Sequence, residues 1–190
     1  MTRLHWVRHG PTHAKTMVGW SDLPADLSDS ARLERLSRHL PDEAAVVSSD
    51  LMRAVQTADA IAGDRTQLAP DRDLREIYFG EWELQAFDGV PDKALLRSFW
   101  ETPGDICPPG GESWNAFTAR VNTAIDRLLK AHPGRDLIVV AHMGTILTQV
   151  QRALGISGYD AFAHKIDNLS VTELHCVAGN WDAVSINHCP

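Results

Sequence analysis

The stretch Leu4-His5-Trp6-Val7-Arg8-His9-Gly10 sets a pattern that indicates the fold: a short apolar run leads directly into two basic side chains and a glycine. Runs of this length are typical of buried strands. Two further stretches have the same order: Ala44 to Val47 precedes Ser48-Ser49-Asp50, and Leu137 to Ala141 precedes His142-Met143-Gly144. The repetition predicts three strands that each end in a polar turn and are followed by a helix-like segment.

Helical spacing marks the segments between these runs. The apolar positions that recur at helical intervals are Leu33, Leu36 and Leu40; Leu51, Ala54, Val55, Ala58, Ile61 and Ala62; Phe117, Val121, Ile125 and Leu128; and Ile146, Leu147, Val150 and Leu154. Asp50 or Ser49 can cap a helix over about 51–62, and Gly63 can end it. Near the end of the chain, 169–174 and 181–186 are predicted to be two strands joined by a turn.

Strands that alternate with helices predict an α/β protein. We expect a three-layer α/β/α sandwich with a mostly parallel sheet and an antiparallel edge strand. The length of 190 residues and a hydrophobic content of 44% suit a single domain over 1–190. The stretch 76–111 is rich in proline and glycine and has one plausible helix, near 91–100. We interpret it as an excursion over the active face.

The charge balance limits the partners. With 18 Lys and Arg against 25 Asp and Glu, the net charge of −7 argues against an unselective nucleic-acid binder. No signal-peptide-like run opens the chain, and no stretch of about 18 apolar residues occurs. Cys107, Cys176 and Cys189 are odd in number and lack C-x-x-C spacing, which is typical of reduced thiols. We therefore predict a cytoplasmic protein with no membrane or nucleic-acid partner; the sequence does not indicate its oligomeric state.

Basic side chains gather at the predicted strand ends. Arg8 and His9 follow the first strand, Arg53 lies just inside the helix after the second, and His142 follows the third. Parallel sheets bind ligands at the carboxyl ends of their strands, and guanidinium pairs hold tetrahedral dianions bidentately. The arrangement predicts a small phosphorylated molecule as the partner.

An imidazole beside a bound phosphate can act as a nucleophile if it is neutral, which makes His9 the candidate. The departing alkoxide then needs a proton from a nearby acid. Glu76 is the candidate for this acid, although Glu81 and Glu83 offer the same chemistry.

Several segments carry a family resemblance. They are Arg8-His9-Gly10 with Thr12, Gly19-Trp20-Ser21-Asp22, Ser48 to Ala58, Leu74 to Glu83, Pro109 to Ser113, Val139 to Gly144, and Asn168 to Thr172. In order and spacing they resemble the histidine phosphatase superfamily, which includes the cofactor-dependent phosphoglycerate mutases. Among its members the chain most resembles the short α-ribazole phosphatase and broad-specificity phosphatase group.

The resemblance implies a phosphoglycerate mutase-like fold and a metal-independent phosphatase that hydrolyses a small phosphomonoester and needs no cofactor. It implies that His9 is transiently phosphorylated and that Glu76 acts first as acid and then as base. It further implies that Arg8, Arg53 and His142 bind the phosphoryl oxygens. Thr12, Met143 and Trp20 are additional predicted contacts to the substrate or phosphate.

Alternatives remain open at this point. A phosphoglycerate mutase-type phosphotransferase is one, although 190 residues leave little room for the insertions of those longer chains. A catalytically inactive phosphate- or phosphopeptide-binding module is another. His5, His9 and His13 have the spacing of a helical metal site, but the strand pattern and Gly10-Pro11 disfavour it. The chain departs from the family pattern at Lys15, Ala31 and Leu84, which leaves the edge of the pocket less defined.

Overall fold

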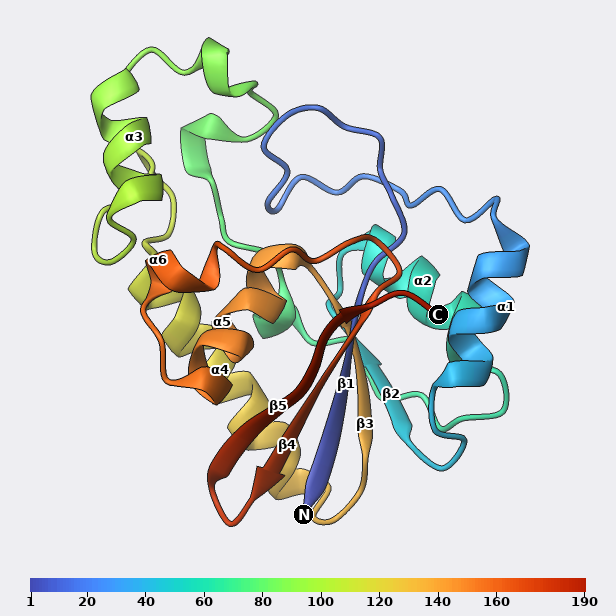
Figure 1. Ribbon diagram of the computed structural model, residues 1–190. Coiled ribbons are helices and arrows are strands. Elements are labelled where there is room, and N and C mark those ends of the chain that lie inside the picture. The colour runs from blue at the N-terminus through green and yellow to red at the C-terminus, as the bar shows by residue number, and fades with distance from the viewer.

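A computed structural model describes residues 1–190, and its centre is a five-stranded sheet with the strand order β2-β3-β1-β4-β5 (Figure 1). The strands are β1 (Thr2–Arg8), β2 (Ala45–Ser48), β3 (Leu137–Ala141), β4 (Val171–Val177) and β5 (Asn180–His188). β1, β2 and β3 are parallel to one another, β4 runs antiparallel to β1, and β5 runs antiparallel to β4. The predicted parallel sheet with an antiparallel edge is confirmed, and that edge consists of two strands.

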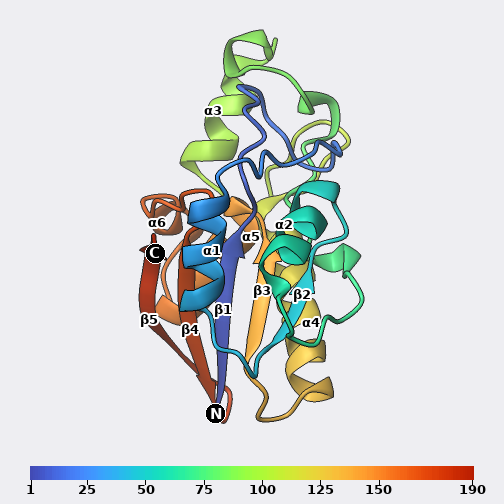
Figure 2. The ribbon, with the colours of Figure 1, turned by 90° about the vertical axis from the view of Figure 1, so that its right-hand side faces the viewer.

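Helices cover both faces of the sheet. α1 (Ser30–His39) and α2 (Met52–Ala62) lie on one face, and α4 (Trp114–Ala131) and α5 (Met143–Leu154) lie on the other (Figures 1 and 2). Side chains along β1 alternate between the layers, because Leu4 and Trp6 join a core of 26 buried residues and Val7 joins a separate core of 14. The predicted three-layer sandwich is therefore confirmed.

The long segment between α2 and α4 lies over the carboxyl ends of the strands (Figures 1 and 2). It contains three short 3₁₀ turns, at Arg72–Leu74, Gly80–Trp82 and Phe87–Gly89, followed by α3 (Lys93–Glu101). A final short helix, α6 (Gly158–Ala161), follows α5. α3 lies close to the helix predicted near 91–100. None of the helices has the length and apolar character needed to cross a membrane.

The start of α2 differs from the prediction. Neither Ser49 nor Asp50 occupies the cap position; Leu51 does, without a side-chain cap. Instead Asp22, from a distant loop, accepts a hydrogen bond from the Met52 backbone N–H at 2.7 Å. Asp50 is engaged elsewhere, because both its carboxylate oxygens accept hydrogen bonds from the Arg75 guanidinium. A tertiary contact therefore replaces the local cap.

Candidate active site

His9 lies directly after β1 and is buried, with 7% of its surface exposed. Its Nδ1 lies 2.6 Å from the carbonyl oxygen of Gly10. A carbonyl only accepts, so Nδ1 carries the proton and Nε2 keeps its lone pair. Burial, reinforced by the charge of Arg53, lowers the pKa of His9 to about 3. The ring is therefore neutral, and its tautomer suits a nucleophile.

The backbone around His9 is fixed from two sides. The Gly10 N–H donates to Thr57 Oγ1 at 2.9 Å, and Asn168 Nδ2 donates to the His9 carbonyl at 2.8 Å. Thr57 belongs to α2 and Asn168 precedes β4, so elements far apart in the chain hold the turn after β1. This turn holds His9 at the carboxyl end of β1.

Arg8 and Arg53 keep their charges without a direct carboxylate partner. Arg53 donates to the carbonyls of Gly19 and Ser21, at 2.7 and 2.9 Å. Arg8 donates to the Ile166 carbonyl at 2.5 Å, and its buried Nε has no partner. Burial lowers the pKa of both guanidiniums. They nevertheless remain cations, because the ordinary pKa of arginine is very high. A buried cation, Arg53, and a partly buried one, Arg8, both held by neutral carbonyls, favour an anionic guest.

His142 directly precedes α5 and is fully buried. Its ring centroid lies 5.1 Å from that of His9, and neither ring nitrogen has a hydrogen-bond partner. Burial lowers its pKa well below the usual value, and the charge of Arg53 adds to this effect. Buried polar atoms are rarely left unsatisfied in native structures, so this ring is suited to a ligand oxygen.

Glu76 follows the 3₁₀ turn Arg72–Leu74, and its carboxyl contacts the start of α5. Its two carboxylate oxygens accept from the N–H groups of Ile77 and Gly144, each at 2.9 Å. A side chain at Gly144 would collide with this carboxyl, because a Cβ there would lie 2.3 Å from Glu76 Oε1. Burial raises the pKa of Glu76 and outweighs the two hydrogen bonds and nearby arginines that lower it. The carboxyl is thus suited to holding a transferable proton.

These side chains meet at a cavity of about 200 Å³. Its 13 lining residues are Arg8, His9, Thr12, Ala14, Thr16, Met17, Val18, Arg53, Glu76, Phe79, Phe87, Trp100 and Met143. Six of the eight predicted site residues are among them, and His142 is buried beside His9. The aromatic members Phe79, Phe87 and Trp100 were not predicted: Phe79 and Phe87 come from a segment of short turns without a periodic pattern, and the helical position of Trp100 in α3 does not indicate that its ring reaches the cavity.

Trp20, predicted to contact substrate, does not line the cavity. Its indole N–H donates to the backbone carbonyl of Glu76 at 2.9 Å. Its ring lies against Tyr78, with centroids 4.8 Å apart, and near the guanidinium of Arg75 at 5.0 Å. Trp20 therefore supports the backbone of Glu76 from outside the cavity.

The two rival carboxylates are also absent from the cavity lining. Glu83 accepts hydrogen bonds from the backbone N–H groups of Gly19, Trp20 and Ser21, and Glu81 is exposed. No group of three or more His, Cys, Asp or Glu side chains is arranged to hold a metal ion. Of the three spaced histidines, His13 is exposed and contacts Asp26 at 2.7 Å.

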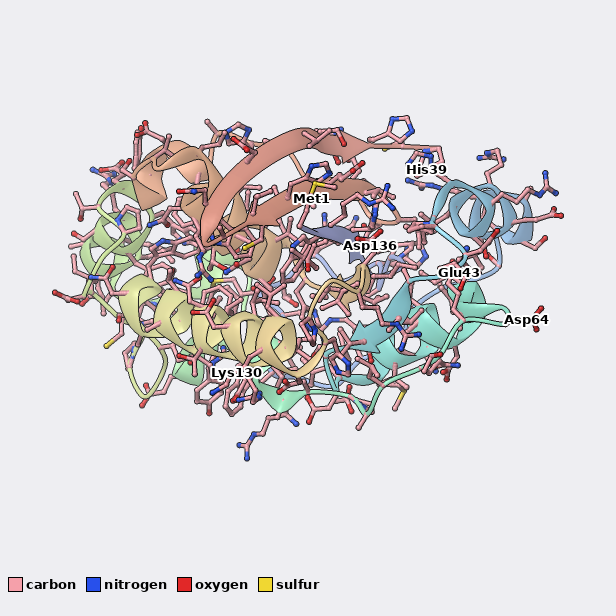
Figure 3. The ribbon with its side chains drawn as sticks, turned by 90° about the horizontal axis from the view of Figure 1, so that it is seen from below. Met1, His39, Glu43, Asp64, Lys130 and Asp136 are labelled. Carbon is pink, nitrogen blue, oxygen red and sulfur yellow. The ribbon has the colours of Figure 1, made fainter.

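A larger hollow, of about 520 Å³, lies at the opposite end of the sheet among Glu43, Asp64 and Arg65. Figure 3 shows this end from below, with Met1, Glu43 and Asp64 labelled. The Arg65 guanidinium is already bound by backbone carbonyls, including those of Ser37 and Leu40 at 2.8 Å. None of the predicted site residues lines this hollow.

Comparison with known proteins agrees with this geometry. The profile of the histidine phosphatase superfamily (branch 1) matches residues 4–188. The chain is 29% identical to an adenosylcobalamin/alpha-ribazole phosphatase of Salmonella typhimurium, over 97% of this chain and 90% of that protein. It is 34% identical to phosphoglycerate mutase-like protein 4 of Arabidopsis thaliana, over 77% and 69%. The structure of Bacillus stearothermophilus YhfR superposes with a TM-score of 0.91 at 25% identity, covering 100% of this chain and 98% of that one.

Proposed function

Because the chain belongs to the histidine phosphatase superfamily, we propose that residues 1–190 form one catalytic unit that hydrolyses a small phosphomonoester through a phosphohistidine on His9. The observation that carries this proposal is the free Nε2 of a neutral His9, in a cavity lined by Arg8 and Arg53 without carboxylate partners. Such an arrangement stabilises a phosphoryl group and leaves the nucleophile unprotonated.

In the first step, Nε2 of His9 attacks phosphorus, and the bond between phosphorus and the alcohol oxygen breaks. Arg8 and Arg53 hold the non-bridging oxygens, and the uncommitted N–H of neutral His142 donates to one of them. Glu76 transfers its proton to the departing oxygen, so the alcohol leaves neutral. The raised pKa of Glu76 keeps this proton available.

In the second step, water attacks the phosphohistidine. The Glu76 carboxylate left by the first step takes a proton from this water as the P–N bond breaks. Inorganic phosphate leaves, His9 regains its lone pair, and Glu76 is again protonated. The cycle closes on the chain's own residues.

The test is hydrolysis of p-nitrophenyl phosphate and small alkyl phosphates in excess chelator. We expect His9→Ala to abolish turnover and an acid-labile, base-stable phosphoryl label to appear on the wild-type protein alone. The matched control is His188→Ala, at an exposed histidine on β5. Full turnover by His9→Ala would refute the nucleophile assignment.

A mutase reaction is separated by a second assay. The protein is incubated with 3-phosphoglycerate and trace 2,3-bisphosphoglycerate, and both isomer exchange and free phosphate are measured. A phosphatase releases phosphate, whereas rapid exchange without release would support the mutase alternative. Measurable phosphate binding without turnover of any ester would instead support the binding module.

A further inference from the structure

Charge is unevenly distributed in the cavity. The ionisable lining residues are Arg8, His9, Arg53 and Glu76, and all four belong to the phosphoryl end. The other lining residues are neutral: Thr12, Ala14, Thr16, Met17, Val18, Phe79, Phe87, Trp100 and Met143. A carboxylate on the alcohol part of a substrate would face this neutral wall without a cation, and burying an unpaired charge is costly.

The neutral wall ends in an aromatic surface. Phe87 lines the cavity and is 54% exposed, so a bound molecule can cover its ring. Its ring centroid lies 5.8 Å from that of Trp100, which in turn lies 6.1 Å from Phe79. The three rings therefore lie in the order Phe87, Trp100, Phe79, and each contacts the next along one wall of the cavity.

Both outer rings are held in place. Trp100 packs edge-on against Phe99 at 4.9 Å and lies 5.5 Å from Phe162. The turn that carries Phe87 is fixed by Lys93, whose ammonium donates to the carbonyls of Phe87 and Asp88 at 3.0 and 2.7 Å. A preformed aromatic wall binds a flat apolar group with little loss of conformational freedom.

A second, smaller hollow of about 30 Å³ continues this wall. It shares Glu76, Phe79, Trp100 and Met143 with the main cavity, and its other members include Phe99, Leu147 and Phe162. Its surface is almost entirely apolar, and its volume is too small for an aromatic ring. It can take a methyl-sized substituent beside the leaving-group oxygen.

We propose, on the basis of the phosphatase function above, that the preferred substrate is the phosphate ester of an uncharged, flat apolar alcohol held against Phe87 and Trp100. Esters with a carboxylate on the alcohol are disfavoured. Lys15 lies in the sequence between the lining residues Ala14 and Thr16, but its side chain is exposed and does not line the cavity. The Lys93 ammonium is already bound to backbone carbonyls.

The experiment uses three alkyl esters, so that leaving-group acidity does not dominate. Glycerol 3-phosphate and 3-phosphoglycerate differ in a hydroxymethyl group against a carboxylate, and benzyl phosphate supplies the flat apolar group. We expect kcat/KM to fall in the order benzyl phosphate, glycerol 3-phosphate, 3-phosphoglycerate, with about 10-fold or more between the first and second. Equal or faster turnover of 3-phosphoglycerate than of benzyl phosphate would overturn the inference.

Two variants locate the preference. Phe87→Ala, at a half-exposed position where little packing is lost, should lower the ratio of benzyl to glycerol phosphate turnover about 5- to 10-fold. The control Tyr159→Ala removes an aromatic ring that is 60% exposed and outside the cavity, and should leave the ratio unchanged. An unchanged ratio in Phe87→Ala would contradict the aromatic contact.

Thr16→Arg supplies the missing cation on the neutral wall and should raise the relative turnover of 3-phosphoglycerate. If wild-type protein already prefers 3-phosphoglycerate and Lys15→Met removes that preference, the neutral-wall inference is wrong while the phosphatase assignment stands. If His9→Ala loses all turnover but the wild-type protein shows no preference among the esters, the neutral-wall inference is also wrong and the phosphatase assignment stands. Absence of turnover with every ester would instead count against the proposed function itself.

Discussion

Replacing Glu83 by glutamine should weaken phosphate binding, although Glu83 does not line the cavity. One carboxylate oxygen accepts from the N–H groups of Gly19 and Ser21 at 3.1 and 3.2 Å and from the Ser21 hydroxyl at 2.6 Å. The other accepts from the N–H groups of Trp20 and Phe79 at 2.7 and 3.2 Å. Glutamine has one acceptor oxygen, so in either orientation two backbone N–H groups face an amide that cannot accept.

The cost follows from these contacts. Two charge-assisted hydrogen bonds at about 1.5 kcal/mol each, the lower end because the loop is only partly buried, predict a loss of about 3 kcal/mol in the free energy of unfolding. The loop that loosens also carries the Gly19 and Ser21 carbonyls that hold Arg53. We therefore expect the inhibition constant for inorganic phosphate to rise about 10-fold, which equals about 1.4 kcal/mol.

The assay measures urea unfolding, the inhibition constant of phosphate, and kcat separately from KM. Glu81→Gln is the matched control, because Glu81 is exposed and its side chain makes no hydrogen bond or ion pair. Unchanged phosphate affinity in Glu83→Gln would refute the positioning role. A loss confined to kcat, with an altered pH profile, would instead identify Glu83 as a proton donor.

Three further predictions concern the site. The first step requires a protonated Glu76 and a neutral His9. We therefore expect kcat/KM on alkyl esters to rise through about pH 3, where His9 loses its proton, and to fall as the pH rises through the raised pKa of Glu76. The pH profile of Glu76→Gln should lack the falling limb. Thr57→Val leaves the buried Gly10 N–H without its acceptor, so the free energy of unfolding measured in urea should fall by about 1–3 kcal/mol and kcat should fall as well. Equal stability of Thr57→Val and Thr57→Ser would contradict this. Gly144→Ala should displace the carboxyl of Glu76. The hydrolysis of alkyl esters should then slow more than that of p-nitrophenyl phosphate, whose leaving group needs less help from an acid. An equal loss of turnover for both substrates in steady-state assays would argue against displacement of the acid.

The sequence predicted the family, the phosphatase class and the fold, all of which are confirmed. It also predicted that Arg8, His9, Arg53 and His142 lie close together, because buried apolar runs mark strand ends, and the structure brings these side chains together. It did not predict that Asp22 caps α2 at Met52, since a cap from a distant loop leaves no local pattern. Trp20 was misplaced because tertiary packing, not motif membership, decides which way an indole faces. Phe87 was missed because it lies in a short turn without periodicity, and Trp100 because a helical pattern does not show which face of α3 meets the cavity.

The carbonyl-held guanidiniums of Arg8 and Arg53 also bear on heat tolerance. A carboxylate in their place would neutralise them permanently, but it would occupy the space of the phosphoryl group. The two guanidiniums repel each other, and a bound tetrahedral oxyanion would reduce this repulsion. Phosphate or vanadate at 100 times its dissociation constant should stabilise the native state by about 2.7 kcal/mol. The reaction product is consequently both a competitor of the substrate and a protectant of the protein.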